Sequence, residues 1–354
     1  MSVQLQPDVC VPSSSAPLVS AVVVNWNGGD MLFESLESLF GQSYGRIEVI
    51  LVDNASTDGS GDEAVRRFGS RLHVIWNVEN TGFAFANNQG IAQARGEWIF
   101  LLNNDAIADR EAIRELVDFG ASRREVGMLA CRVLQKDAPD HFDSVGLLFY
   151  PDGVARSRGW AERDEGQYDR AEEILAPNAC AAMYRRAMLE EVGVFDDAYF
   201  MYLEEMDLAV RGQLSGWRCW YVPSARAWHK KSATAGNSSS KKAYFVERNR
   251  VWNAVKLLPR GMLVRSPLST LRRYVVQGYA AARGRGLSAE FVGQHSFGQV
   301  AGVMLRAYGA AALRLPEMMA KRREIQGRRR LSVGEWNQLL RRHELSVVEL
   351  AMKA

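Results

Sequence analysis

Cysteine is scarce in this chain, and its few thiols lie far apart. The four cysteines, Cys10, Cys131, Cys180 and Cys219, form no C-x-x-C pair. Zinc ribbons and disulfide-stapled folds both need closely spaced cysteines, so the sequence argues against them. This cysteine usage fits a reducing compartment.

Long apolar runs are also missing. No stretch of 18 apolar residues occurs, and the best candidate, Val300 to Leu315, is interrupted by Arg306 and Arg314. The N-terminus has neither the basic start nor the apolar core of a signal peptide. We therefore expect a cytoplasmic protein without a spanning helix, and a short disordered tail over residues 1–17.

A third absence is the glycine fingerprint of dinucleotide-binding dehydrogenases. These proteins need G-x-G-x-x-G directly after the first strand, so that backbone can approach a pyrophosphate. Here the apolar run Val19–Val24 continues as N-W-N-G-G-D, which lacks that spacing. Asp53 could pass for the ribose-binding acid of such a fold, but without the fingerprint we set the dehydrogenase interpretation aside.

The composition is that of a globular protein, with 47% apolar and 24% charged residues. Its charge is distributed unevenly. Residues 241–354 hold 22 basic and 7 acidic residues, a formal charge of +15, whereas residues 1–240 carry −12. An acidic N-terminal part and a basic C-terminal part indicate that the two parts have different partners.

Short apolar runs alternate with amphipathic stretches over the first third of the chain. Strands are predicted at Val19–Val24, Ile47–Val52, Leu72–Trp76 and Glu97–Leu102, and helices at Met31–Phe40, Asp58–Phe68, Phe83–Arg95 and Asp109–Phe119. This order predicts an α/β fold whose parallel sheet is covered on both faces. Beyond residue 243 the chain is expected to be mainly helical.

Polar clusters follow three of these predicted strands. They are Asn25–Gly29, Asp53–Asp58 and Asn103–Asp105. Each is an ordinary turn sequence when taken alone. Because the carboxyl ends of parallel strands meet at one edge, where α/β proteins bind ligands, the three together predict a shared ligand site.

Seven motifs occur in the order that is typical of glycosyltransferase family 2. They are V-V-V-N-W-N-G, V-D-N-A-S-T-D-G-S, E-N-T-G-F-A-F-A-N-N-Q-G-I, L-L-N-N-D, F-D-D-A-Y-F-M-Y-L-E-E-M-D-L-A-V-R, W-H-K-K-S-A-T and Y-F-V-E-R-N-R. The chain resembles that family from about Leu18 to Lys256. The resemblance implies a GT-A fold, a Rossmann-like sheet, here with a helical, basic C-terminal extension. It also implies a divalent metal, a nucleoside-diphosphate sugar donor and inversion at the anomeric carbon.

On these terms we expect a catalytic domain over residues 18–256 and a helical, basic region over residues 257–354. The resemblance assigns the nucleotide sugar to the polar side chains after the strands and to the start of the third helix, whose free N–H groups suit phosphate. The expected nucleotide-sugar-binding residues are Asn25, Asn27, Asp53, Asn54, Asn80, Gly82, Asn87, Asn88, Asn103 and Asn104.

The expected metal ligands are Asp105 and His229. Asn103-Asn104-Asp105 stands where the family has its D-x-D motif, so only the last residue supplies a carboxylate. His229 matches the family's late histidine near the pyrophosphate. We expect Mg²⁺, which prefers oxygen ligands, or Mn²⁺, which also accepts imidazole.

The acidic run Glu204-Glu205-Met206-Asp207 resembles the family's catalytic segment. Carboxylates in a first helical turn also complement the helix dipole, so a structural role is an alternative. The family's pair is usually Glu-Asp with the second member as general base, which assigns the base to Glu205 and leaves Glu204 as the other candidate. Asp207 is expected to orient the helix start or an acceptor group.

Two tryptophans, Trp160 and Trp217, are candidate platforms for the acceptor, although core packing is the alternative for both. The stretch Arg158–Trp160 with Asp164–Asp169 resembles a loop of rhamnosyltransferase-like members. We therefore expect transfer of one sugar, with dTDP-rhamnose as the favoured donor, to a lipid-linked or polymeric bacterial surface glycan. No nucleic-acid partner is expected.

Two other functions remain open at this point. A processive polysaccharide synthase would carry spanning helices and a Q-x-x-R-W motif, of which the chain has only R-N-R-V-W. A nucleotide-sugar-binding protein without turnover is the other, because the N-N-D and E-E motifs are atypical.

The basic C-terminal region contains an apolar helical stripe. Its members are Val300, Val303, Met304, Ala307, Tyr308, Ala311 and Leu315, and the clusters Lys321–Arg323 and Arg328–Arg330 follow. An anionic membrane surface, here the inner face of the cell membrane, would attract this pattern. Packing on the catalytic domain, or on a second subunit in a homodimer, would explain it equally well.

Overall fold

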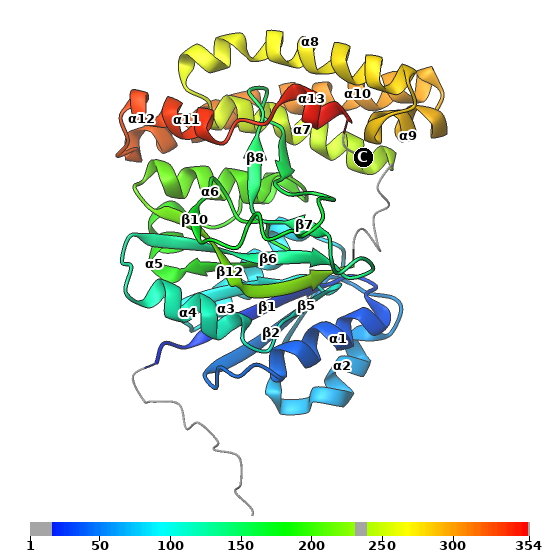
Figure 1. The fold of residues 1–354 in the computed structure, drawn as a ribbon. Helices are drawn as coiled ribbons and strands as arrows, with labels where there is room; N and C mark the ends of the chain where they lie inside the picture. The colour runs from blue at the N-terminus through cyan, green and yellow to red at the C-terminus, as the bar shows by residue number, and fades with distance from the viewer. Residues whose placement is uncertain (1–15, 231–238, 353–354) are drawn as a thin grey trace, which may run out of the picture.

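The computed structural model describes residues 16–230 and 239–352. Its first part confirms the predicted alternation of strands and helices (Figure 1), and the predicted ends are within three residues of the observed ones. The elements are β1 (Val19–Asn25), α1 (Gly29–Phe40), β2 (Ile47–Asp53), α2 (Ser60–Phe68), η1 (Gly69–Arg71), β3 (Leu72–Trp76), α3 (Phe83–Gln93), β4 (Trp98–Leu102), β5 (Ala106–Ala108) and α4 (Ala112–Ala121). Most of the tail predicted over residues 1–17 lies outside the described residues.

A less regular segment of short strands and two helices follows. It comprises β6 (Val126–Gln135), β7 (Phe142–Ser144), β8 (Leu147–Phe149), β9 (Ala155–Ser157), β10 (Glu172–Glu173), β11 (Ala181–Arg185), α5 (Arg186–Val192), η2 (Asp197–Tyr199), α6 (Glu204–Leu214) and β12 (Arg218–His229). β8 and β9 form a separate hairpin that rises from the sheet toward the C-terminal helices (Figure 1).

The main sheet has the strand order β10-β12-β6-β11-β4-β1-β2-β3, with β5 paired to β12 and β7 paired to β6. Strands β1 to β4 are mutually parallel, as predicted. β11 runs antiparallel to both β4 and β6, so the complete sheet is mixed. This insertion joins the parallel half to β6 and β12, and it brings the end of β12 to the same edge as the ends of β1, β2 and β4.

Helices cover both faces of the sheet. On one face α1, α2 and α4 contribute Leu32, Leu36 and Ile113 to the core, and on the other α3, α5 and α6 contribute Ile91, Met188 and their neighbours. β4 is buried along its whole length, which is the burial expected of a central strand covered on both faces. The two apolar layers fix the sheet, so the polar side chains beyond its strand ends project from a rigid base.

The C-terminal helices form a layer across one end of the molecule, beyond the sheet, and α8 is the outermost of them (Figure 1). They are α7 (Ser240–Leu257), α8 (Arg260–Ala282), α9 (Gly286–Gln294), α10 (Phe297–Leu313), α11 (Leu315–Arg328), α12 (Val333–Arg342) and α13 (Val347–Met352). Within the part of the chain that the structure describes, no helix combines the length and the apolar character needed to cross a bilayer.

The apolar stripe predicted on the C-terminal region lies on α10, and its centre packs on the rest of the protein. Val303, Ala307 and Ala311 are buried. Ala311 belongs to the apolar cluster of Trp252 on α7, whose indole Nε1 donates to the Ala311 carbonyl at 3.3 Å. Of the two expectations for this stripe, packing on the catalytic domain is therefore the one that the structure shows.

Buried ion pairs fasten the C-terminal helices to the segment between β8 and β9. Asp152 is fully buried, and its Oδ2 lies 2.7 Å from Arg273 Nε on α8. Glu247 on α7 lies 2.5 Å from Arg250 Nε and 2.9 Å from Arg273 Nη1. Because each charge has partners, burial is tolerated, whereas removal of one partner would leave another charge unpaired in a dry environment.

We therefore predict that Asp152→Ala lowers the free energy of unfolding by about 3–5 kcal/mol, the usual cost of breaking a buried ion pair. Urea unfolding followed by circular dichroism would measure the change. The matched control is Glu63→Ala, which removes a carboxylate from the exposed pairs with Arg66 and Arg67. Exposed pairs contribute little, so a control as destabilised as Asp152→Ala would contradict the assignment.

Candidate active site

The three polar clusters meet at one edge of the sheet, as the sequence predicts. Asn25 and Asp53 are register partners at the ends of β1 and β2. The Asn25 amide donates to Asp53 Oδ2 at 2.8 Å and to Ser60 Oγ at 2.8 Å, and its oxygen accepts from Asn104 Nδ2 at 3.0 Å. One buried amide thus ties the ends of β1, β2 and β4 together.

A second group of amides connects the loops that surround this edge. Asn27 Oδ1 accepts from the Thr57 N–H at 2.7 Å. Asn54 Oδ1 accepts from the Thr81 N–H at 2.9 Å, and its Nδ2 donates to Asn80 Oδ1 at 3.0 Å. These side chains hold the loops in fixed positions, so any ligand that they bind would meet loops that are already ordered.

The expectation that the start of α3 binds phosphate is wrong. The N–H groups of Phe83 and Ala84 donate to the Phe200 carbonyl, at 2.6 and 3.2 Å. Gly82 has φ +85°, and a Cβ there would lie 2.5 Å from the same carbonyl oxygen. The glycine is therefore needed for the close approach of another segment of this chain, which occupies the free end of the helix.

Two other residues expected at the nucleotide also hold protein segments. Asn87 donates to the Phe83 carbonyl within α3 at 2.9 Å. Asn88 donates to the Phe195 carbonyl at 2.9 Å and to Asp197 Oδ1 at 2.6 Å. Asn88 and Gly82 thus attach α3 to the segment that precedes α6, whereas Asn87 bonds within the helix, and its nucleotide-binding role stays a prediction.

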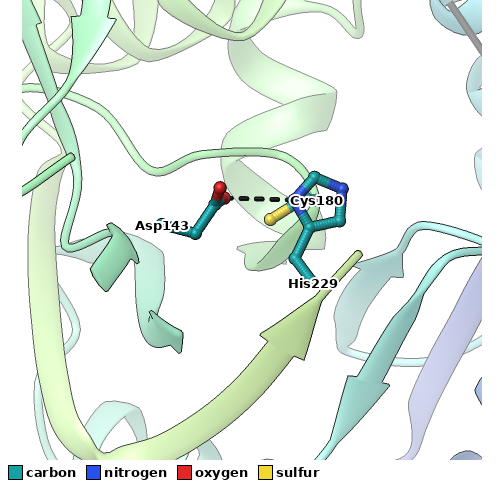
Figure 2. A group of neighbouring side chains, drawn as sticks. All are labelled: Asp143, Cys180 and His229. Carbon is teal, nitrogen blue, oxygen red and sulfur yellow. Dashed lines mark hydrogen bonds and ion pairs between the residues drawn. The ribbon is translucent and has the colours of Figure 1, made fainter. Parts of the chain in front are cut away.

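The predicted metal ligands Asp105 and His229 lie together where β4, β5 and β12 end. Asp105 Oδ1 is 3.2 Å from His229 Nε2, and His229 is the β-ladder partner of Ala106. Two residues that sequence reasoning missed complete the group, Asp143 on β7 and Cys180 just before β11. Figure 2 shows the side chains of Asp143, Cys180 and His229 gathered at one point, with ligand atoms within 4.8 Å of one another.

Asp143 accepts from the other ring nitrogen of His229, with 3.1 Å between Oδ2 and Nδ1. Burial disfavours the charged imidazolium, but hydrogen bonds and the charges of Asp105 and Asp143 outweigh it and raise the pKa of His229 to about 10. The two carboxylates that flank the His229 imidazole stabilise a positive charge at this place. A histidine that ligates through Nε2 is commonly oriented by a carboxylate at Nδ1, the position that Asp143 holds.

The donor set fits a divalent cation. Asp105 is nine-tenths buried, and its Oδ1 makes no hydrogen bond although it faces the imidazole. A buried carboxylate oxygen without a hydrogen bond is costly unless a cation or a proton satisfies it. Asp105 and His229 Nε2 would therefore hold the ion, Asp143 would orient the histidine, and the Cys180 thiol is protonated because burial raises its pKa well above the usual value.

Glu204 and Glu205 begin α6 side by side, Glu204 buried and Glu205 half-buried. Burial, and after it the charge of Glu205, raise the pKa of Glu204. Burial also raises the pKa of Glu205 above the ordinary carboxyl range. Oε2 of each residue is buried without a hydrogen-bond partner. The negative charges of Asp143, Asp105 and Glu205 all act on Cys180, which places Glu205 within electrostatic reach of the cluster in Figure 2.

The segment that leads into these glutamates is strained. Phe200, Tyr202 and Leu203 have φ of +64°, +69° and +71°, a left-handed conformation that bulky residues rarely adopt. Asn249 on α7 donates through its single Nδ2 to the carbonyls of Tyr199, Met201 and Tyr202, at 3.1, 2.9 and 2.7 Å. This hydrogen bonding compensates the strain and fixes the start of α6.

Asn249 is a third functional candidate that sequence reasoning missed. It stands inside the family motif Y-F-V-E-R-N-R, which was the available signal, but the sequence does not show what the amide contacts. Its neighbour Arg248 supports the same segment, donating to the carbonyls of Ala198 and Tyr199 at 3.1 and 2.6 Å.

Asp207 does not face a substrate. It is fully buried, with Oδ1 at 2.6 Å from Lys256 Nζ and Oδ2 at 2.9 Å from Arg211 Nε. Oδ1 thus attaches α6 to α7 and Oδ2 pairs within α6, so both oxygens have protein partners, which argues against the acceptor role and leaves the orienting one.

Trp217 is also wrongly assigned to the acceptor. It lies just before the start of β12, at the opposite end of that strand from His229. Its indole instead donates to Glu191 at 2.9 Å. Trp160 is different, because the next residue, Ala161, donates to the Phe142 carbonyl at 3.0 Å, beside Asp143. Its acceptor role stays a prediction.

Comparison of the sequence with known proteins finds a match to one protein family. Residues 20–193 match the model of glycosyl transferase family 2. The N-acetylglucosaminyl-diphospho-decaprenol L-rhamnosyltransferase of Mycobacterium tuberculosis is 28% identical over 241 residues, 62% of this chain and 78% of that protein. Glycosyltransferase GlyG of Streptococcus pneumoniae is 39% identical over 101 residues, 28% of this chain and 34% of that protein.

Solved structures show the same fold. The mannosyltransferase PcManGT of Pyrobaculum calidifontis, in complex with GDP-Man and Mn²⁺, aligns with a TM-score of 0.52 over 89% of this chain and 90% of that one, at 19% identity. GalNAc-T7 with UDP, GalNAc and Mn²⁺ aligns with a TM-score of 0.56 over 77% of this chain and 51% of that one, at 15% identity. The strand-end site, the fold and the matched residues agree: the chain carries a region that matches glycosyl transferase family 2 over residues 20–193, and it is a nucleotide-sugar-dependent glycosyltransferase with the GT-A fold.

Proposed function

We propose that this enzyme transfers one L-rhamnose from dTDP-rhamnose to a hydroxyl of a lipid-linked bacterial surface glycan, with inversion. The observation that carries the transfer chemistry is the pair of Asp105 and His229 at the sheet edge, with Glu205 on α6 near enough for its charge to act on Cys180 of the same cluster. Sugar and acceptor rest on the relative from M. tuberculosis, whose name specifies an L-rhamnosyltransferase and a diphospho-decaprenol acceptor.

The roles of the residues follow from their positions. Asp53 and Asn25, tied together at the ends of β2 and β1, would hold the nucleoside. Asn54 and Asn80 would shape the neighbouring loop. Asn103 and Asn104 lead from β4 to Asp105. Asn27 lies in the loop after β1, where its side chain accepts from the Thr57 N–H. Mg²⁺ or Mn²⁺ held by Asp105 and His229 would neutralise the diphosphate as it leaves.

Glu205 would act as the general base. Its raised pKa, caused by burial, brings the carboxylate closer to the basicity that proton removal at neutral pH requires. As the acceptor hydroxyl gives its proton to Glu205, its oxygen forms the bond to C1 of the sugar, and the bond from C1 to the diphosphate oxygen breaks. Glu204, buried beside it, would keep the site acidic and dry.

The donor assignment is tested by thermal unfolding with a panel of nucleotide sugars. We expect dTDP-rhamnose with Mn²⁺ to raise the melting temperature most, because a ligand that binds only the native state stabilises it by mass action. Asp105→Ala and His229→Ala should lose the metal-dependent part of this shift, while Asp53→Ala should lose binding with or without Mn²⁺. Equal shifts with UDP- or GDP-sugars would overturn the donor assignment, and equal losses with and without Mn²⁺ for Asp105→Ala would overturn its metal role.

Glu205→Gln should lower kcat by roughly 10²–10⁴-fold while donor affinity stays unchanged, because the amide is nearly isosteric but cannot take a proton. In the native enzyme the rate should fall with decreasing pH around a pKa above the ordinary carboxyl value of about 4.3, since the base must be ionised and burial raises its pKa. Glu204→Gln is the matched control. If it abolishes transfer while Glu205→Gln does not, the base is Glu204.

Asn249→Ala should lower kcat by about 10²-fold, the usual effect of displacing a catalytic group by about 1 Å, while the donor KM stays close to that of the native enzyme. The reason is loss of the hydrogen bonds that fix the segment before Glu204. Steady-state kinetics below the melting temperature of the variant would separate the two constants. Asn337→Ala is the control, because Asn337 is a half-buried asparagine on α12, far in sequence from the segment before α6, and its amide donates to the Val333 carbonyl within that helix. A rise in KM with kcat unchanged would contradict the positioning role.

A further inference from the structure

Helix α8 has its polar and apolar faces reversed relative to an ordinary surface helix. Its inward face carries Arg273, which is paired with Asp152, and Tyr274, whose hydroxyl donates to Glu247 at 2.7 Å. Its outward face carries five large apolar side chains that are 51–81% exposed. They are Val264, Leu268, Leu271, Val275 and Tyr279. These recur every three or four residues, so they form one stripe along the helix.

Such a stripe is unusual on a surface that only water contacts. Single exposed apolar residues are ordinary, but a contiguous apolar patch marks a surface that something else covers. The 23-residue helix is ~35 Å long at ~1.5 Å per residue, and it is the outermost helix of the molecule (Figure 1). Nothing among the described residues lies outside it, so none of them covers the stripe.

The charges beside the stripe identify the occupant. α8 contains four arginines and no acidic residue, and Arg260, Arg265 and Arg272 are exposed. From residue 257 to residue 316 the sequence has a single acidic residue, Glu290. An apolar stripe flanked by arginine is the pattern of a helix that lies in the headgroup region of an anionic membrane.

A second copy of the chain fits this face less well. In a two-fold dimer the same patch meets itself, so these arginines would face their own copies. α8 offers no carboxylate to pair with them, and like charges brought together are destabilising.

We propose that the outward face of α8 is a membrane-docking surface that binds anionic lipid, with the five apolar side chains inserted at the headgroup boundary and Arg260, Arg265 and Arg272 on the lipid phosphates. This surface differs from the stripe on α10, whose centre is buried against α7. The proposal does not depend on the donor or acceptor, but it would bring the enzyme to a lipid-linked substrate.

Co-sedimentation of the full chain with vesicles tests the proposal without any sugar substrate. We expect binding to phosphatidylcholine vesicles that contain phosphatidylglycerol, weak binding to phosphatidylcholine alone, and release by high salt. Each basic residue near an anionic surface strengthens binding about fivefold, so Arg265→Gln with Arg272→Gln should weaken it on the order of tenfold or more. Leu268→Ser with Leu271→Ser and Val275→Ser should abolish it, and the unchanged melting temperature of these variants would show that the fold is intact.

The matched control replaces exposed valines elsewhere, Val65→Ser with Val78→Ser, and should bind as the native chain does. The proposal is overturned if the native chain stays in the supernatant at low salt with anionic vesicles. It is equally overturned if the triple serine variant still binds them. A native dimer in sedimentation velocity that the triple variant dissociates would assign the face to self-association instead.

Discussion

The hydrogen bonds from Asn249 to the backbone before α6 are the constraint on which the active site depends. Three acceptors within four residues, the carbonyls of Tyr199, Met201 and Tyr202, converge on one amide nitrogen. The same segment contains three bulky residues with positive φ, a conformation that costs about 1–3 kcal/mol at each and persists only where its surroundings impose it. The direction of α6, and with it the position of both glutamates, is therefore set by α7, a helix that follows them in the sequence.

The same segment also connects the two sides of the molecule. The Phe200 carbonyl accepts from the first N–H groups of α3, while Arg248 and Asn249 bind the carbonyls on either side of it. α6 is further attached to α7 by the pair of Asp207 with Lys256. The proposed base Glu205 is thus supported from the strand-end half of the protein and from the C-terminal helices together, which fits the extension of the family motifs into α7.

The sequence predicts this fold well where a residue's environment depends on its near neighbours. The alternation of apolar runs locates β1 to β4 and their helices, and the shared edge of parallel strands brings Asn25, Asp53 and Asn104 together as expected. Contacts between distant segments are not encoded in local spacing. The pair of Asp143 with His229 joins residues 86 positions apart. The amide of Asn249 meets carbonyls 47–50 positions away. The Phe200 carbonyl accepts from Phe83, 117 positions before it, at the start of α3. Asp207 and Trp217 were misjudged for the same reason, since residue type alone does not show which partner a side chain meets.

The ladder between β5 and β12 has a consequence for how the metal site forms. His229 is paired with Ala106, the residue after Asp105, so the distance between the two ligands is determined by strand register. A slip of one residue would turn the imidazole to the other face of the sheet. The site can therefore form only when β12, the last strand in the sequence, has paired with β5 in the correct register. Affinity for the ion would then report that folding at this edge is complete.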